Sequence, residues 1–228
     1  MKTKLLILSL STALALNAAD SDTNISQTLD NINNSVKTKF NDMKEHAKGM
    51  FASSSDEIKS EMHKEMKDKG MQFDKKVEND YLTNMIPHHQ GAIDSSKSLL
   101  KYSKDDHVRK IAQNIIDHQE KEIKEFKEIL DDKNFKTTKL SEQEYSNFVK
   151  EQKQTMEIMM KNMMSVKNSG NVDKDYLEAM IPHHQGAIDS SKSLLKYSKD
   201  DHVRKIAQNI IDHQEKEIKE FKEILKSK

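Results

Sequence analysis

Residues 85–130 read MIPHHQGAIDSSKSLLKYSKDDHVRKIAQNIIDHQEKEIKEFKEIL, and residues 180–225 repeat these 46 residues without a change. The chain is therefore a tandem duplication, and any chemistry assigned to one copy applies to the other as well. Identity alone shows only that the unit was copied, because a recent duplication copies indifferent residues too. The repeated unit carries eight of the ten histidines: His88, His89, His107, His118, His183, His184, His202 and His213.

The pattern of each copy predicts two helices. In its second half, apolar residues recur in steps of three and four, as at Ile116 and Ile123, which is the period of an amphipathic helix. The first half predicts a helix over residues 80–102. Pro87 lies inside that helix and lacks a backbone N–H, so we expect a kink or a restart just before the histidine pair.

A third helix is predicted in front of each copy. Ser53 to Asp56 interrupt the preceding pattern and provide an N-cap for a helix that Gly70 ends. Ser141 followed by Glu144 predicts the start of the corresponding helix before the second copy. No stretch indicates a strand. The fold expected is all-α, with two tandem helical-bundle units of about three helices each.

The N-terminus has the pattern of an export signal. A basic start, an apolar run from Leu5 to Leu16 and small residues up to Ala19 are typical of a cleaved secretory signal peptide. The run is shorter than the roughly 20 apolar residues that span a bilayer. We therefore expect a soluble, periplasmic mature protein without a membrane span.

The segment after the signal predicts a helix of its own. Its apolar residues form one narrow stripe, which is typical of an amphipathic or coiled-coil-like helix and suggests self-association. The stripe consists of Ile25, Leu29, Ile32, Val36, Phe40, Met43, Ala47 and Met50. The domain boundaries predicted are signal 1–19, N-terminal helix 20–54, first repeat 55–130, linker 131–140 and second repeat 141–228.

Composition excludes several functional classes. There is no cysteine, so neither disulfides nor thiolate ligands are available in an oxidising compartment. Removing the two signal lysines leaves 36 basic against 38 acidic residues, a net charge of −2 with both signs interleaved. Nucleic acid is therefore not an expected partner.

The histidines are the first candidates for chemistry. Imidazole is the commonest metal-binding side chain, and His88 and His89 stand side by side. On the following helix, His118 and Glu122 are spaced i,i+4 and lie on one face. Gln119 points into the apolar stripe, where an imidazole from the facing helix would suit it as a partner. The second copy gives the same candidates: His183, His184 and His213.

Methionine indicates which metal is expected. Twelve methionines remain after the signal, and they recur one helical turn apart before each copy. Thioether is a soft ligand, so imidazole with thioether and no thiolate favours Cu(I), with silver as Ag(I) the second candidate. The competing interpretation is that methionine only fills gaps in helical cores. The candidate thioether ligands are Met62, Met66, Met85, Met156, Met160, Met163 and Met180.

Known catalytic metal patterns are absent. A di-iron carboxylate site needs Glu-x-x-His on paired helices, and no histidine here has a glutamate three positions before it. The zinc protease motif His-Glu-x-x-His is absent as well. We therefore expect no enzymatic activity.

Two motifs resemble a known family. Met85 to Asp94, which reads MIPHHQGAID, followed by Gln119-x-x-Glu122, resembles the domain-of-unknown-function 305 family, and the second copy matches at the corresponding positions. The resemblance implies two tandem ferritin-like helical units in an exported protein, since the family includes members that bind copper or silver and support tolerance of those metals. This chain departs from the family pattern at Ser95 and Ser96, where relatives usually have Met-Ala.

The function expected is copper binding in the periplasm, as Cu(I) or Cu(II), for metal tolerance or homeostasis. The partners expected are the metal ion and a periplasmic copper exporter or chaperone. The alternative is a helical structural or interaction protein whose His and Met residues serve packing. The sequence leaves open whether each repeat has its own site or the two share one.

Overall fold

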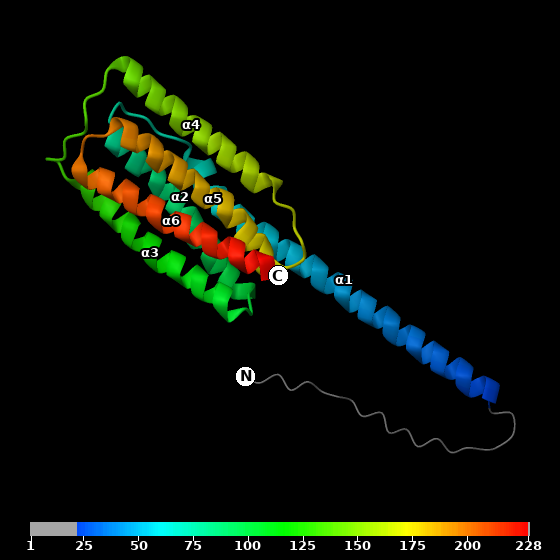
Figure 1. The fold of residues 1–228 in the computed structure, drawn as a ribbon. Coiled ribbons are helices and arrows are strands. Elements are labelled where there is room, and N and C mark those ends of the chain that lie inside the picture. Colours follow the sequence, from blue (N-terminus) through cyan, green and yellow to red (C-terminus); the bar gives the residue numbers. More distant parts are fainter. Residues whose placement is uncertain (1–21, 228) are drawn as a thin grey trace. The chain divides into compact units, whose positions relative to one another are not determined.

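Six α-helices form nearly all of the computed structural model, which describes residues 22–227 (Figure 1). No strand occurs in that range, so the all-α prediction is confirmed. Within it no helix is long and apolar enough to cross a membrane. The expected signal, residues 1–19, lies outside the described part. The helices are α1 (Asp22–Lys69), α2 (Val77–Tyr102), α3 (Asp106–Asp131), α4 (Glu142–Ser165), α5 (Val172–Tyr197) and α6 (Asp201–Ser227).

The chain divides into two compact units, residues 1–46 and 47–228. In the first unit, residues 22–46 belong to α1, as expected for an N-terminal helix. Its apolar stripe is open: Ile32, Val36, Phe40 and Met43 are 51% to 66% exposed. An exposed apolar stripe of this kind is typical of a surface that associates with another molecule.

The predicted interruption at Ser53 to Asp56 is wrong, because α1 continues through these residues. Ser54 and Ser55 are buried, and the Ser55 hydroxyl donates a 2.6 Å hydrogen bond to the carboxylate of Asp175. The serines therefore anchor the side of a continuous helix and do not cap a new one. The prediction for Gly70 is confirmed: it follows the last helical residue with φ of +61°, which glycine adopts without strain.

Both copies of the repeat lie within the second unit. Helices α2 and α5 contact each other, α3 packs along α2, and α6 and α4 pack along α5 (Figure 1). The C-terminal part of α1 lies on α2, where Glu57 accepts hydrogen bonds from Ser98 and Lys101. The three-helix units predicted from the sequence are therefore present, but they share one body.

Helices α2 and α5 are joined by a reciprocal pair of buried hydrogen bonds. The hydroxyls of Tyr81 and Ser191 lie 2.7 Å apart, and those of Ser96 and Tyr176 lie 2.7 Å apart. Both tyrosines are nearly inaccessible to solvent, so losing either serine would leave a buried phenol unpaired. Because each bond joins one copy to the other, the repeats hold each other in register.

The apolar core is also shared between the copies. One cluster places Met62 and Met66 of α1 with Tyr176 and Met180 of α5. A second large cluster places Tyr81 and Phe126 of the first copy with residues of α5 and α6. Two smaller clusters each lie within one copy: Ile93, Ile116 and Ile123 in the first, and Ile188, Ile211 and Ile218 in the second. The larger part of the apolar core is therefore shared between the copies.

The helix ends carry the capping residues that helices prefer, whereas the proline does not interrupt its helix. Ser141 and Glu144 form the predicted capping box at the start of α4, and Asp105 caps α3 by accepting from the backbone of His107. Helix α2 is not restarted at Pro87, which lies inside one helix of 26 residues. The expected restart before the histidine pair is therefore wrong.

Gly91 and Gly186, which occupy the same position in the two copies, allow two different distances between neighbouring helices. A Cβ on Gly91 would lie 2.1 Å from the carbonyl oxygen of Met62, so α1 meets α2 backbone to backbone. A Cβ on Gly186 would lie 2.4 Å from the Sδ atom of Met159, so α4 stands one side chain away from α5. The same position in the two copies is thus used for two different kinds of packing.

The substitution Gly91→Ala should destabilise the fold by about 1–3 kcal/mol, because a backbone carbonyl cannot move aside as a side chain can. Gly186→Ala is the matched control, since Met159 can move and alanine favours the helix. Urea unfolding of both variants measures the difference. Equal stability of the two variants would contradict the backbone contact.

Candidate metal site

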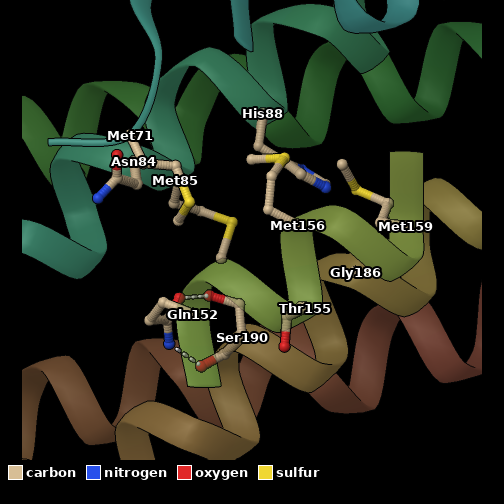
Figure 2. Close-up of a pocket in the computed structure, with 10 residues that line it drawn as sticks. All are labelled: Met71, Asn84, Met85, His88, Gln152, Thr155, Met156, Met159, Gly186 and Ser190. Carbon is tan, nitrogen blue, oxygen red and sulfur yellow. Dashed lines mark hydrogen bonds between the residues drawn. The ribbon is translucent and has the colours of Figure 1, made fainter. Parts of the chain in front are cut away.

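A small cavity of about 30 Å³ lies between α2, α4 and α5 (Figure 2). It is lined by four methionines and one histidine, together with short polar side chains. The lining residues are Met71, Asn84, Met85, His88, Gln152, Thr155, Met156, Met159, Gly186 and Ser190. Figure 2 shows the four thioethers turned toward the cavity, with the imidazole of His88 near Met156 and Met159.

The thioethers come from three separate segments. Met85 belongs to α2, one turn before His88, and is buried. Met156 and Met159 belong to α4, which precedes the second copy. Met71 lies in the segment between Gly70 and α2 and is only partly buried. The cavity is therefore built by both repeats, so neither copy contains it alone.

Polar contacts hold the wall that carries Met156 and Met159. The Gln152 amide donates to the Ser190 carbonyl at 3.0 Å, and the Ser190 hydroxyl donates to Gln152 at 2.6 Å. Gly186 gives Met159 the space to lie against α5. These contacts fix α4 on α5 at the distance of one methionine side chain.

His88 presents a nitrogen suited to a metal. Its side chain is buried, and Nε2 donates to the backbone carbonyl of His183 at 3.1 Å. With the proton on Nε2, Nδ1 carries the lone pair, and no residue bonds to it in the described structure. Burial, followed by the neighbouring imidazoles of His89 and His184, holds the pKa of His88 well below its usual range. His88 is therefore a neutral imidazole with an unused acceptor.

The second copy lacks an equivalent cavity wall. Glu57 and Glu151 make the same contacts, to Ser98 and Lys101 and to Ser193 and Lys196, so they are equivalent positions. Counting from them, the counterparts of Met156 and Met159 are Met62 and Glu65. Counting from the identical blocks, which lie 95 positions apart, the counterparts of Met71 and Met85 are Val166 and Met180. Two of the four thioethers have thus been replaced, and at Gly91 the backbone of α1 occupies the place that the Met159 side chain takes at Gly186.

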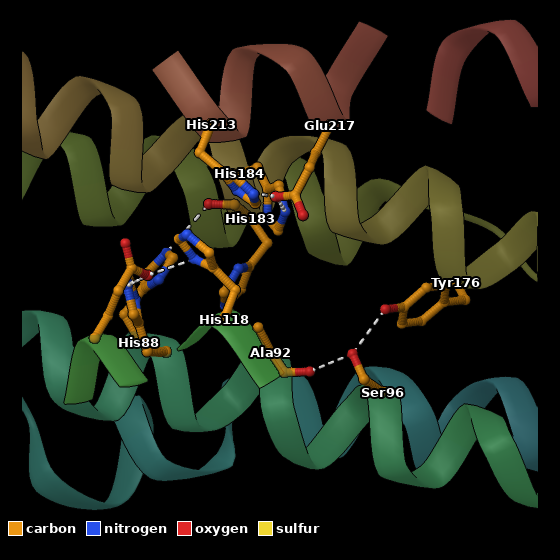
Figure 3. Close-up of polar contacts among 11 residues, drawn as sticks. His88, Ala92, Ser96, His118, Tyr176, His183, His184, His213 and Glu217 are labelled. Carbon is orange, nitrogen blue, oxygen red and sulfur yellow. Dashed lines mark hydrogen bonds and ion pairs between the residues drawn. The ribbon is translucent and has the colours of Figure 1, made fainter. Parts of the chain in front are cut away.

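A second group of residues lies around two glutamates, Glu122 and Glu217, of which Figure 3 labels Glu217. Glu122 accepts from His89 at 2.9 Å and lies 3.3 Å from Nδ1 of His118. Burial would raise the pKa of Glu122, but the hydrogen bonds from His118 and His89 lower it to about 2. The carboxylate is therefore ionised and fixes both imidazoles. The i,i+4 relation of His118 and Glu122, predicted from the sequence, is present.

The second copy repeats this arrangement around Glu217. His184 lies 2.9 Å from Glu217, and Nδ1 of His213 lies 3.4 Å from the same oxygen. The two groups meet at two close pairs of rings, each joining one copy to the other: His118 and His213 are stacked, with planes 7° apart, whereas the planes of His88 and His183 are tilted by 35°. The ring centroids of His88 and His183 are 3.8 Å apart, as are those of His118 and His213.

Several buried polar atoms have no hydrogen-bond partner among the described residues. Both nitrogens of His183 are in this class, as is Nδ1 of His89. The Oε1 atom of Gln119 is unpaired as well, so the imidazole partner expected for it is not found. Within residues 22–227, no group of three or more His, Asp or Glu side chains is arranged to hold a metal ion.

The structure separates the candidate ligands that the sequence grouped together. Met85, His88 and Met156 lie on the cavity. Four other methionines are buried in the apolar core: Met62, Met66, Met163 and Met180. Met160 is partly buried and packs against that core.

Two methionines of the cavity, Met71 and Met159, are not among the ligands predicted from the sequence. Met159 lies four residues before Met163, so the helical spacing of the methionines could have identified it. Met71 stands outside any helix and gave no periodic signal.

The chain matches the sequence model of the domain of unknown function DUF305 over residues 9–130 and again over residues 78–225. Among solved structures, it is similar to a DUF305 protein from Streptomyces coelicolor with a TM-score of 0.52 and 21% identity, covering 67% of this chain and 92% of that one. This similarity shows a shared fold.

Two further relatives were found. A structure of CopM in the Ag-bound form has 26% identity and a TM-score of 0.49, over 69% of this chain and 98% of that one. The uncharacterized protein L153 of Acanthamoeba polyphaga mimivirus is 45% identical over 53 residues, which are 23% of this chain. The match spans about a third, 35%, of the length of that curated relative.

Acid should destabilise the fold through the buried imidazoles. Burial and the neighbouring rings hold the pKa values of His88 and His183 well below 6.5, so below pH 6.5 the unfolded chain binds protons that the folded chain does not. Each group then removes up to about 1.4 kcal/mol of stability per pH unit. The raised pKa of His213, caused by its hydrogen bond to Glu217, acts in the opposite direction but involves one group only.

Urea unfolding at pH 7, 6 and 5 measures this slope. The His183→Leu variant should flatten it, because one buried titrating group is removed. The His107→Gln variant is the control, because it removes an exposed histidine and keeps both buried rings. A slope that His183→Leu does not alter would contradict the assignment.

Proposed function

This chain belongs to the DUF305 family, and we propose that it binds Cu(I), or Ag(I) as a chemical analogue, in the cavity between its two repeats. The ligands are drawn from Met71, Met85, Met156, Met159 and the Nδ1 atom of His88. The observation that carries the proposal is the convergence of four thioethers and an unpaired, neutral imidazole on one small space.

The donor set selects the metal. Thioether sulfur is a soft, uncharged ligand, and hard cations such as Mg²⁺ and Ca²⁺ require oxygen ligands, which the cavity offers only sparsely. Cu(I) accepts sulfur and neutral nitrogen, and its single charge is less costly to bury than a double charge. The copper- and silver-binding members of the family that the MIPHHQ motif resembles support the same choice.

The packing interpretation explains less of this cavity. Methionine fills irregular gaps in cores, and Met62, Met66 and Met180 illustrate that role here. Gap filling by methionine does not explain why the buried imidazole beside it has a nitrogen without a hydrogen-bond partner. His88 bears the cost of burying that nitrogen, and a bound ion would offset it.

The biological role proposed is sequestration or transfer of copper in the periplasm, without catalysis. Met71 and Met156 are only partly buried, so the cavity can be reached from solvent and an ion can be passed to an exporter or chaperone. The export pattern of residues 1–19 supports a periplasmic location.

A competition titration of Cu(I) against a chromogenic chelator tests the proposal. The wild-type protein should bind one Cu(I) ion tightly. The double variant Met85→Leu and Met156→Leu keeps side-chain volume and should weaken binding by about a hundredfold or more, about 2.7 kcal/mol.

The repeat supplies the matched control for this experiment. Met180 and Met62 are the positional equivalents of Met85 and Met156 in the other copy, and they lie in the core. The double variant Met180→Leu and Met62→Leu should therefore retain Cu(I) binding. Equal loss in both double variants, or no binding by the wild type, would refute the cavity as the site.

A second candidate function rests on the exposed face of α1. Ile32, Val36, Phe40 and Met43 form an apolar stripe in the first unit with more than half of each side chain exposed. This stripe supports the alternative of a helical interaction protein, which associates with itself through the N-terminal helix. The two functions are compatible because they use separate units.

The substitutions Val36→Glu and Phe40→Glu test self-association, because charged residues on the stripe prevent burial of the apolar face. Light scattering coupled to size exclusion should show a higher mass for the wild type than for the variant. Thr38→Glu is the control on the same helix, at an exposed position outside the stripe. A monomeric wild type would exclude this function.

A further inference from the structure

The segment between α3 and α4 is held on the start of α2 by one buried carboxylate. Glu78, in the first turn of α2, accepts hydrogen bonds from the hydroxyls of Thr137 and Thr138. It also accepts from the backbone N–H of Thr138 at 2.8 Å. Burial would raise the pKa of Glu78, but the hydrogen bonds from Ser198 and from the two threonines hold it below its usual value. The carboxylate is therefore ionised and binds the segment with charge-assisted hydrogen bonds.

The end of α5 completes this first groove. The hydroxyl of Ser198, the residue after α5, donates to Glu78 at 2.6 Å. The backbone N–H of Lys199 donates to the hydroxyl oxygen of Thr138 at 2.8 Å. Figure 1 shows the segment between α3 and α4 at the end of the bundle where α5 leads into α6.

Apolar side chains flank the two threonines of the bound segment. Phe135 and Leu140 are partly buried and pack against the apolar cluster that contains Val77, the first residue of α2. The residues from 135 to 140 are not helical. The first groove, between the start of α2 and the end of α5, thus binds a non-helical segment with two adjacent hydroxyls.

The duplication builds the same groove a second time, between the start of α5 and the end of α2. The loops before α2 and α5 have the same shape, since Lys75 and Gly170, 95 positions apart, have φ of +62° and +85°. Asp80 and Asp175 each accept a hydrogen bond from the backbone N–H six residues earlier, at 2.9 and 2.8 Å. The two loops are therefore equivalent in structure as well as in sequence position.

The second groove contains a cavity of about 240 Å³. The residues that line it are Tyr102, Lys104, Gly170, Asn171, Val172 and Asp173. Counting back 95 positions, Asp173 corresponds to Glu78, and counting forward, Lys104 corresponds to Lys199. The two positions that hold Thr138 in the first groove therefore both lie on the cavity. Asp173 is only partly buried, whereas Glu78 is fully covered.

Two substitutions distinguish the second groove from the first. Asp173 keeps the carboxylate of Glu78 but is one methylene shorter, which leaves more room. Asn171 accepts from the backbone N–H of Asp173 at 3.1 Å, whereas in the first groove the Thr137 hydroxyl accepts from the backbone N–H of Glu78 at 3.4 Å. The start of α5 is thus capped by its own chain, so the fold does not require an occupant in the second groove.

We propose that the second groove binds a non-helical segment of another protein, one that carries two adjacent hydroxyl residues flanked by apolar side chains. The carboxylate of Asp173 accepts from the segment, and the backbone N–H of Lys104 donates to one of its hydroxyls. The chemistry of the occupant is that of residues 134–140, which read NFKTTKL. In every copy of this chain those residues are already bound at the first groove, so the occupant comes from a different protein.

The second groove shares no residue with the thioether cavity. Peptide binding therefore goes beyond the metal function proposed above, and either proposal can fail without the other.

A nuclear magnetic resonance titration of the ¹⁵N-labelled protein with the synthetic peptide NFKTTKL tests the second groove. The amide signals of Lys104, Gly170 and Asp173 should shift until the groove is saturated. The peptide NFKVVKL should bind about tenfold or more weakly, because valine has nearly the shape of threonine but no hydroxyl.

A matched pair of protein variants makes the outcome specific. Asp173→Asn should weaken binding of NFKTTKL by about tenfold or more, because it removes the charged acceptor. Asp201→Asn, the same change in the first turn of α6, should leave binding unchanged. The unshifted signals of each variant report whether its fold is kept.

Three results would overturn the proposal: equal binding of the two peptides, equal binding by the two variants, or shifts confined to residues outside the second groove. Groove signals of the wild type that shift with protein concentration alone would show that a second copy of this chain is the occupant, and would overturn the assignment to another protein.

Discussion

The contact between α2 and α5 is the constraint on which the rest of the structure depends. The Tyr81–Ser191 and Ser96–Tyr176 hydrogen bonds are buried, so each must be satisfied, and each joins one copy to the other. This contact brings the His88 and His183 rings together. It also places α2 beside α4, so the thioethers of the two repeats meet at one cavity.

Identical sequences occupy different environments on the two sides of this contact. The repeated histidines and Met85 or Met180 are the same in both copies, but the helix that covers them differs. Helix α4 stands away from Gly186 by one methionine side chain, whereas α1 meets Gly91 through its backbone. A duplication that began with two equal units has therefore become one body, in which the four methionines of the cavity have no full set of counterparts in the other copy. The histidine pairs, by contrast, retain the twofold arrangement.

Much of the fold could be predicted from the sequence because local rules govern it. The period of the apolar residues, the Ser141 capping box and the stop at Gly70 each depend on neighbours a few residues away. The predictions that the structure contradicts failed where tertiary contacts override local signals. Ser53 to Asp56 has the composition of a helix start, but Ser55 is held inside a continuous helix by Asp175, 120 positions away. The pairing of His118 with Glu122 was predictable because it is a contact within one helix turn.

The sequence by itself determined the helices, the duplication and the types of ligand available: thioether and imidazole without thiolate. Only the tertiary structure decided which of those ligands meet. Met62 and Met156 are equivalent in sequence register, yet one lies in the core and the other lines the cavity, because the distance between helices differs on the two sides. Met71, outside any helix, joins the cavity through the path of the chain after Gly70. Periodicity places a side chain on a face of its helix, and the packing of helices far apart in the sequence sets what that face meets.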